Sequence, residues 1–478
     1  MPNNIVNAAL IENMLGKEIA LEKWKLNLSK MPQKKIVSKK SSSLCGEIVV
    51  PGDKSISHRA LILSALCIGS SKIRNILESE DVFSTASALR AMGVHIEKIG
   101  AEWQVDGVGV GGLHEPEDII NLGNSGTSAR LLIGLVATSR FCATFTGDSS
   151  LRRRPMKRVT VPMELFGAKT LGRSNGRLPL TIQGAQEPVG IDYVMPIASA
   201  QVKSAILLGA LNVPGITTVT ERAPSRDHTE RMLSGFGAQV EKNAAEDGGH
   251  TISIQGWAEL QSIPEICVPG DFSSAAFPIA AALMCEGSSI VLKNIGVNAT
   301  RVGLYTTLQE MGGDITIENT RIISGEDVAD IRACFSPNLK GVTIPTERVP
   351  LMIDEFPILA MIAACAEGTT VIKGIAELRL KESDRISAVT KPLSECGVEV
   401  AETQDSLTIH GRGLQSIIGG IVVHPLMDHR IAMAFACLGF ASKDGIIISD
   451  ASVVRSSFPT FVDDMHRLGG NISIQEVL

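Results

Sequence analysis

A glycine that closes a helical pattern and opens an alternating, strand-like run recurs six times along this 478-residue chain. The six are Gly93, Gly167, Gly237, Gly312, Gly397 and Gly469, at successive spacings of 74, 70, 75, 85 and 72 residues. Glycine is favoured just after a helix because the backbone there takes a positive φ. The chain is therefore predicted to consist of six similar units of roughly seventy residues, which fill it from about residue 45.

A second helical run, rich in Ala, Leu and Ile, lies upstream of each glycine and begins with polar residues. Each unit is predicted to run helix, strand, helix, glycine, strand. Aromatic residues make up only 4% of the chain, so small aliphatic side chains must form the core, which suits layered α/β packing. The units could form a solenoid or two domains of three units. Solenoid repeats usually have about 20–50 residues, so these longer units favour two domains whose helix N-termini face the cleft between them.

Basic residues gather at the predicted helix starts. They are Lys54 and Arg59 in the first unit, Arg130 and the run 152–158 in the second, Lys203 and Arg226 in the third, Lys381 and Arg385 in the fifth, and Arg430 in the sixth. The net charge of −6 argues against a general nucleic-acid-binding surface. Arginine beside Ser, Gly and Thr at helix starts is typical of phosphate and carboxylate recognition. Taken singly, Ser55 could be only a helix cap, and 152–158 only a solvated turn.

Two carboxylates stand among these cations in the fifth unit. Asp354 opens an apolar helical run, and Glu382 lies between Lys381 and Arg385. Nearby cations favour the ionised carboxylate. Two carboxylates beside a bound anion could move a proton onto and off a carbon atom. An aspartate at a helix start is also a common cap, so this pattern alone leaves both interpretations open.

Other classes of protein are disfavoured by what the chain lacks. The nine cysteines form no C-x-x-C pair and the histidines no H-E-x-x-H motif, which argues against a zinc site. Several cysteines lie inside apolar runs, as in reduced proteins of the cytosol, so a cytoplasmic location is expected. No apolar stretch reaches the ~18 residues of a membrane span. Residues 1–43 are expected to form an N-terminal extension outside the fold, either disordered or an amphipathic helix with a basic linker.

Six motifs together resemble the 5-enolpyruvylshikimate-3-phosphate synthase family. They are PGDKSISHRAL, NLGNSGTSARLL, RRRPMKRV, PIASAQVKSAILLGAL, RLKESDRI and DHRIAMAF, within about residues 44–478. RPM and SAQVKSAILL are more similar to the bacterial class II subgroup. The resemblance implies a two-domain inside-out α/β barrel, the enolpyruvyl transferase fold, with six βαβαββ-like repeats. Residues 53–269 would form the N-terminal-type domain, and 44–52 with 270–478 the C-terminal-type domain, three repeats in each.

The family's reaction is the expected function. It transfers the enolpyruvyl group of phosphoenolpyruvate to the 5-hydroxyl of shikimate 3-phosphate, through a tetrahedral adduct and without a metal or organic cofactor. The resemblance implies that Asp354 takes the hydroxyl proton, that Glu382 gives and removes the proton at the methylene carbon, and that Lys54 contacts both substrates as a candidate proton carrier. Small-molecule substrates are then the expected partners, with no nucleic acid or membrane, and the chain is expected to be a monomer.

The implied binding residues fall into two sets. Shikimate 3-phosphate would be held by Lys54, Ser55, Arg59, Ser199, Gln201, Arg226, Asp354 and Lys381. Phosphoenolpyruvate would be held by Lys54, Gly126, Arg154, Gln201, Arg385 and Arg430.

The chain departs from the common family pattern at four positions. They are Ala200, where many members have Ser; His228, where many have Tyr; Glu377, often Asn; and Ser456, often Lys, with Arg455 beside it. These departures leave the full ligand set open. Two alternatives remain: the related UDP-N-acetylglucosamine enolpyruvyl transferase, whose loop cysteine is missing from 148–158, and a non-catalytic anion-binding protein of the same fold.

Overall fold

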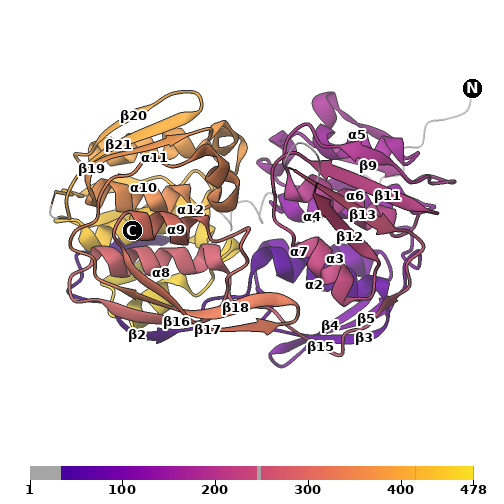
Figure 1. The fold of residues 1–478 in the computed structure, drawn as a ribbon, viewed down its shortest axis with the longest axis horizontal. Coiled ribbons are helices and arrows are strands. Elements are labelled where there is room, and N and C mark those ends of the chain that lie inside the picture. The colour runs from indigo at the N-terminus through magenta and orange to yellow at the C-terminus, as the bar shows by residue number, and fades with distance from the viewer. Residues whose placement is uncertain (1–33, 245–248, 415, 477–478) are drawn as a thin grey trace, which may run out of the picture.

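The computed structural model describes residues 34–244, 249–414 and 416–476, which form two mixed α/β halves lying side by side (Figure 1). Each half has its own hydrophobic core. One core contains residues between Ile56 and Val268; the other contains Ile36, Leu44, Ile48 and Val50 together with residues from Phe272 to Ile472. The chain therefore passes between the cores twice, near residues 51–55 and 269–271. No helix among the described residues is long and apolar enough to cross a membrane.

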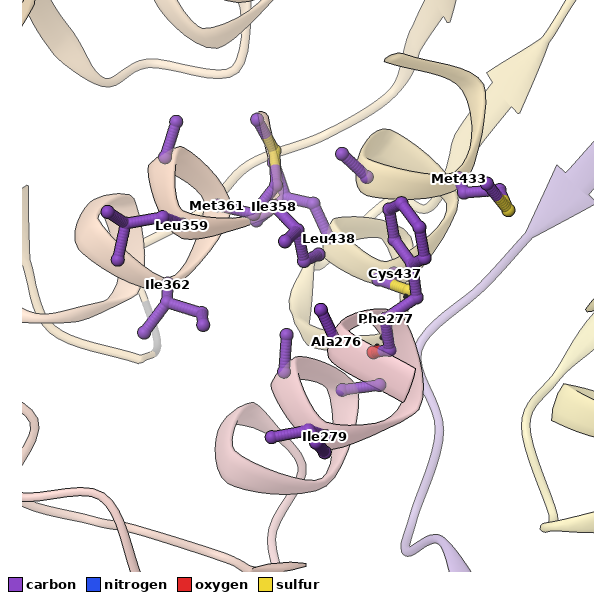
Figure 2. Packing of buried hydrophobic residues seen from close by; sticks show 14 of the residues in the cluster. Ala276, Phe277, Ile279, Ile358, Leu359, Met361, Ile362, Met433, Cys437 and Leu438 are labelled. Atoms are coloured by element: carbon purple, nitrogen blue, oxygen red, sulfur yellow. Dashed lines mark hydrogen bonds between the residues drawn. The ribbon is translucent and has the colours of Figure 1, made fainter. Parts of the chain in front are cut away.

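Three helices form the centre of each half. They are α2 (Lys54–Leu66), α4 (Gly126–Ala137) and α6 (Ala200–Ala210) in one half, and α8 (Phe272–Met284), α10 (Phe356–Cys365) and α12 (His429–Ala441) in the other. Helices that are apolar on all sides are stable only when surrounded by protein, and every residue of α8 and of α10 is buried. Figure 2 shows side chains of α8, α10 and α12 meeting one another, among them Phe277, Met361 and Leu438.

Six further helices of the described residues lie outside these, each followed by one of the repeating glycines. The helices are α3 (Glu80–Ala91), α5 (Lys157–Leu165), α7 (His228–Gly235), α9 (Gly303–Glu310), α11 (Arg385–Glu395) and α13 (Phe461–Arg467). Each ends two residues before its glycine, and the six glycines have φ between 85° and 103°. The positive φ expected at these positions is confirmed. It lets the chain leave the helix and enter the next strand without a steric clash.

Six sheets cover the helices in the described part of the chain. Those of the first half are β14 (Leu260–Gln261), β3 (Cys67–Arg74), β5 (Glu102–Val108) and β4 (His95–Ile99), with β15 (Glu265–Cys267) beside β3; β6 (Ile120–Asn121), β7 (Cys142–Thr146), β9 (Arg177–Gln183) and β8 (Lys169–Arg173); and β10 (Asp192–Val194), β11 (Ile216–Glu221), β13 (His250–Gln255) and β12 (Val240–Ala244).

The sheets of the second half follow the same plan. They are β17 (Asp314–Ile323), β18 (Glu326–Cys334), β16 (Ser289–Gly296) and β2 (Cys45–Ile48); β19 (Glu367–Lys373), β21 (Ser406–Arg412) and β20 (Glu399–Glu402); and β22 (Ile421–Val423), β23 (Ile446–Ile448), β1 (Lys34–Ser38) and β24 (Ile472–Glu476). In both halves the order inner helix, strand, outer helix, glycine, strand occurs three times.

The expectation that residues 1–43 lie outside the fold is wrong for residues 34–43. Strand β1 lies between β23 and β24 and is antiparallel to both, with Ile36 opposite Ile448 on one side and Ile474 on the other. Ile36 is fully buried in the second core, and Ser38 is buried with its hydroxyl donating to the carbonyl of Ala436. The helix considered for the start of the chain concerns residues 1–33, which lie outside the described residues.

A buried carboxylate joins three segments of the second half. Asp330 on β18 accepts hydrogen bonds from the backbone N–H of Asn294 and from the side chains of Lys293, Asn319 and Arg321. Burial alone raises the pKa of this carboxyl, but these donors outweigh it and bring the pKa to about 2. The resulting stabilisation is complete above the unfolded pKa of about 3.9 and is lost as the pH falls through about 2.

Replacement of Asp330 with Asn is therefore expected to lower the free energy of unfolding at pH 7 by about 1–2 kcal/mol, since solvent screens part of the effect. The difference between variant and wild type should shrink as the pH falls below about 4. Urea unfolding at pH 7 and at pH 3 measures both. The exposed Asp314 on β17 supplies a control, because its replacement with Asn should change stability by less than about 0.5 kcal/mol. Equal losses for Asp330→Asn at both pH values would contradict the assignment.

Candidate active site

A cavity of about 390 Å³ lies between the two halves and is lined by residues of both. All thirteen site residues that the family resemblance implies line it: Lys54, Ser55, Arg59, Gly126, Arg154, Ser199, Gln201 and Arg226 from the first half, and Asp354, Lys381, Glu382, Arg385 and Arg430 from the second. Most of them stand at or just before the first turn of a helix. The inner helices thus direct their N-termini, where unpaired N–H groups attract anions, toward the cavity.

The start of α2 is held by capping and by a neighbouring carboxylate. Asp53 accepts a hydrogen bond from the N–H of Ile56 at 2.9 Å, as a helix cap does. The ammonium of Lys54, the next residue, forms an ion pair with the buried Asp81. These two contacts fix the direction in which Lys54 leaves the helix, and Ser55 beside it also faces the cavity.

Arg59, one turn further along α2, is held on three sides. Its Nη1 donates to the carbonyl of Ser55 at 2.9 Å, its Nε to Thr229 Oγ1 at 2.6 Å, and its Nη2 to Ser204 Oγ at 2.7 Å. Burial lowers the pKa of Arg59 to about 10, so the guanidinium remains charged near pH 7. Arg59 therefore presents a fixed positive charge at the cavity wall rather than a mobile one.

The basic run 152–158 divides into two groups. Arg152, Arg153 and Lys157 are exposed, whereas Arg154 and Arg158 line the cavity. Arg154 is buried, and its Nη2 donates to Asn124 Oδ1 at 2.5 Å. Three of the basic residues are thus exposed, as in a solvated turn, whereas the other two remain candidates for anion binding.

Gly126 begins α4 in the space between two guanidinium groups. A methyl group at this position would lie 3.0 Å from Arg154 Nη1 and 3.1 Å from Arg130 Nη1. Arg130 also donates to Gln201 Oε1 at 2.5 Å, and the Gln201 amide donates in turn to Thr127 Oγ1 at 3.0 Å. The absence of a side chain at Gly126 keeps these nitrogens close to the helix N-terminus.

The two carboxylates are surrounded by cations from both halves. Asp354 contacts Arg226 Nη2 at 2.7 Å, Arg385 Nη1 at 3.2 Å and Lys381 Nζ at 3.5 Å. Burial raises the pKa of Asp354, but the charges of these residues and of Arg430 outweigh burial and hold the pKa well below its usual range. Asp354 is therefore an anion at neutral pH, able to accept a proton when its cations are engaged elsewhere.

Glu382 lies between two arginines. It contacts Arg385 Nη2 at 2.7 Å and, across the cavity, Arg154 Nη1 at 3.5 Å. Burial raises the pKa of Glu382, but Arg385, Arg154 and Lys54 together hold it well below its usual range. Arg385 is itself fixed by Asp428, whose Oδ2 accepts from its Nε at 2.8 Å and whose Oδ1 caps α12 at Arg430 N–H. Any anion bound to these arginines would weaken the field that keeps Glu382 ionised.

Lys203 differs from what its place in the sequence suggested. Its side chain is fully buried within the first half and pairs with Glu221 at 3.0 Å and with Glu230 at 2.7 Å, and Lys203 itself does not line the cavity. A lysine at the second turn of an apolar helix can satisfy its charge inside the domain when carboxylates are packed against it. The grouping of Lys203 with the anion-binding cations is therefore wrong.

Sequence reasoning missed several residues of the cavity wall. Asp81, Asp271, Arg301, His228 and His429 all line it, although none was singled out as a ligand. Burial lowers the pKa of His429 to about 3, so this residue is a neutral group beside Arg430. His429 was visible in the motif DHRIAMAF, but Asp81 and Arg301 lie far from any motif. Among the described residues, no three His, Cys, Asp or Glu side chains gather as a metal ligand set.

Comparisons with known proteins agree on one family. The family model for EPSP synthase (3-phosphoshikimate 1-carboxyvinyltransferase) matches residues 38–465. A 3-phosphoshikimate 1-carboxyvinyltransferase of Paracoccus denitrificans is 53% identical over 438 residues, which cover 91% of this chain and 98% of that protein. One from a Jannaschia species is 50% identical over 441 residues, covering 92% and 97%.

Solved structures give the same result. EPSP synthase from Acinetobacter baumannii superposes with a TM-score of 0.82 at 42% identity, covering 93% of this chain and all of the other. The enolpyruvyl transferase NikO from Streptomyces tendae superposes with a TM-score of 0.71 over 94% of this chain and all of the other, but only 18% of residues are identical, so that likeness concerns the fold alone.

Proposed function

Because this chain belongs to the EPSP synthase family, we propose that the residues of its central cavity bind phosphoenolpyruvate and shikimate 3-phosphate and move the protons of the reaction between them. The enzyme is a 3-phosphoshikimate 1-carboxyvinyltransferase of the shikimate pathway, which leads to the aromatic amino acids. It transfers the enolpyruvyl group to the 5-hydroxyl and releases phosphate. The relatives do not favour the UDP-N-acetylglucosamine alternative.

One observation carries the assignment of the site: a single cavity contains cations from both halves around two partly buried carboxylates, Asp354 and Glu382. Each substrate bears a phosphate and a carboxylate group, so the pair brings four anionic groups into one space. Arginine and lysine at helix N-termini provide the matching charge. A neutral sugar or a nucleobase would leave these cations without partners.

Shikimate 3-phosphate is assigned to the cavity wall near α2 and α6. Lys54, Ser55, Arg59, Ser199, Gln201 and Arg226 belong to that wall, and Lys381 and Asp354 come from the other half. The fixed Arg59 guanidinium and the start of α6, whose first N–H groups are not capped by the Ser199 side chain, support binding of an anionic group there. Arg226, now paired with Asp354 at 2.7 Å, reaches across the cavity and can exchange this partner for the substrate.

Phosphoenolpyruvate is assigned to the wall near α4 and α12. Lys54, Gly126, Arg154, Gln201, Arg385 and Arg430 form that set. Arg154 and Arg385 approach from opposite halves and meet at Glu382, so a phosphate and a carboxylate bound between them would tie the halves together. We therefore expect the two halves to close when substrate binds. Without substrate, the cations of the two halves repel one another, whereas a bound anion attracts the cations of both halves.

Proton movement is assigned to the two carboxylates. Asp354, an anion beside Lys381 and Arg226, would accept the proton of the 5-hydroxyl as that oxygen attacks C2 of phosphoenolpyruvate. C3 must gain a proton in the same addition and lose one when phosphate leaves, and Glu382 is assigned to both transfers. Binding of phosphoenolpyruvate to Arg154 and Arg385 would raise the pKa of Glu382 from its lowered value and allow it to carry that proton.

Replacement of Gly126 with Ala is expected to raise the KM for phosphoenolpyruvate by about tenfold, because the methyl group must displace Arg154 and Arg130 at 3.0 and 3.1 Å. The KM for shikimate 3-phosphate should change by less than about threefold. Steady-state phosphate release measures both constants. Gly235→Ala at the end of α7 is the matched control, since its methyl group would meet no atom closer than 3.8 Å. Equal increases for both substrates would contradict the placement of Gly126.

The test of the whole assignment is phosphate release from phosphoenolpyruvate by the purified protein. Release is expected with shikimate 3-phosphate and not with UDP-N-acetylglucosamine as acceptor. Release with the nucleotide sugar would refute the substrate assignment. Binding of both anions without release would refute catalysis and favour an anion-binding protein of the same fold.

The finer architecture of the two halves is part of the same proposal. The inside-out barrel with six βαβαββ-like repeats is supported by inner helices covered by sheets in both halves (Figure 1). The two-domain division is supported by the separate cores on either side of the crossing segments. Monomeric state, cytoplasmic location and membership of the class II subgroup stay predictions as well, and light scattering of the purified protein measures the first.

A further inference from the structure

Two segments with the same four residues form the crossing between the halves. Val50-Pro51-Gly52-Asp53 and Val268-Pro269-Gly270-Asp271 run antiparallel and pair at Gly52 and Gly270. The N–H of Asp53 donates to the carbonyl of Pro269 at 2.7 Å, and the N–H of Asp271 donates to the carbonyl of Pro51 at 2.9 Å. The crossing is thus a reciprocal pair, and each strand of it ends in an aspartate that begins an inner helix.

Both aspartates serve as helix caps. Asp53 Oδ1 accepts from the N–H of Ile56 at the start of α2, and Asp271 Oδ1 accepts from the N–H of Ser273 at 3.1 Å at the start of α8. Each carboxylate therefore caps its own helix with one oxygen and can still form an ion pair with another residue. The two side chains are almost completely buried, at 4% and 3% exposed.

Arg301 joins the two caps. Its Nη1 donates to Asp53 Oδ2 at 3.1 Å and its Nη2 to Asp271 Oδ1 at 3.0 Å, and its side chain is only 4% exposed. Nη2 also donates to Ser273 Oγ at 2.8 Å, and the Ser273 hydroxyl donates to Glu355. A continuous set of contacts therefore leads from the residue before Lys54 to the residue after Asp354.

Arg301 supplies the positive charge for three buried carboxyl groups. Asp53, Asp271 and Glu355 are three buried carboxyl groups around one guanidinium. Burial raises the pKa of Asp271 to about 6, and the charge of Asp53 adds to the effect. Without Arg301, two anionic caps would face each other across the crossing, and like charges buried at such close range repel strongly.

We propose that Arg301 is a positioning residue of the reaction, which holds the start of α2 with Lys54 and the start of α10 with Asp354 in one fixed relation across the crossing between the halves. This inference rests on the roles proposed for Lys54 and Asp354. Arg301 lines the cavity wall behind them, and its bridging contacts are all made to protein groups. Its effect on the rate would therefore pass through the geometry of the reacting side chains, where a displacement of about 1 Å can cost 100-fold.

Arg301→Gln is expected to lower kcat at least tenfold while the KM for phosphoenolpyruvate changes less than about threefold, because Lys54 alone, among the residues assigned to that substrate, directly follows a residue of the bridge, Asp53. Arg301→Lys keeps the charge but not the two-pronged geometry, so an intermediate loss is expected. Arg321→Gln is the control, since Arg321 on β17 also contacts a buried aspartate, Asp330, but neither residue lines the cavity. Its kcat should match that of the wild type.

A double-mutant cycle with Asp354→Asn tests whether Arg301 acts through the reacting groups. If it does, the combined variant should lose much less kcat than the product of the two single losses. Losses that multiply would overturn the proposal, and so would wild-type kcat in Arg301→Gln or in Arg301→Lys. If Arg301→Gln does not fold, the cycle is run with Arg301→Lys. Phosphate release by the wild type with shikimate 3-phosphate reports on the proposed function separately from these comparisons.

Discussion

Replacement of Glu382 with Gln is expected to lower kcat by about 10²–10⁴-fold, the usual contribution of a positioned acid–base group. Glutamine keeps the size of the side chain and can still contact Arg385, which lies 2.7 Å away, but it cannot give or take a proton at the methylene carbon. The same variant should lose the incorporation of deuterium from heavy water into the methylene group of phosphoenolpyruvate. Phosphate release and mass spectrometry of recovered substrate measure the two effects.

Glu310→Gln provides the control for Glu382. Glu310 also forms a close ion pair with an arginine, Arg348 at 2.6 Å, in the same half but outside the cavity lining. Its replacement should leave kcat within about twofold of the wild-type value. A Glu382→Gln variant that retains full deuterium incorporation would show that another group protonates the carbon.

The second large effect is expected for Asp354→Asn, which should lower kcat by about 10²–10⁴-fold. Asparagine cannot accept the hydroxyl proton, and it leaves Arg226 without the ionic partner that joins the halves at 2.7 Å. The lowered pKa of Asp354 means that its contribution to stability is present above the ordinary carboxyl range and is lost only as the pH falls below it. At pH 7 the Asp354 carboxylate of the wild type is therefore ionised, and activity measured there reports on its role in catalysis.

Asp327→Asn is the matched control for Asp354. Asp327 pairs with Arg231 at 3.1 Å, another contact between the two halves, but neither residue lines the cavity. The control should lose less than about threefold in kcat, since half-exposed ion pairs contribute little. Similar losses in the two variants would mean that Asp354 acts by joining the halves and not as a base. Calorimetric binding of shikimate 3-phosphate to each variant separates affinity from rate.

The residues of the cavity could be predicted from the sequence because most of them stand at the starts of helices. Lys54 and Gly126 each come directly after a capping residue, and Arg430 comes two residues after one. Anion-binding helix N-termini use the same small set of side chains wherever they occur. These residues come together in one cavity because each repeated unit directs the N-terminus of its inner helix toward the space between the halves. The resemblance to a family supplied what spacing could not, namely which carboxylate was assigned to which proton.

Local pattern also determined the helices, the six glycines and the apolar centre of each half. Capping, periodicity and positive φ act within a few residues, so the sequence contains their causes side by side. Only the tertiary structure decided the rest. Strand β1 is five residues long and pairs with β23 and β24, which lie more than 400 residues away in the sequence. Lys203 forms its ion pairs inside the first half, with Glu221 among its partners. Arg301 contacts Asp53, 248 residues earlier in the sequence. Pairings of this kind depend on which segments the finished fold brings together, and no local signal records them.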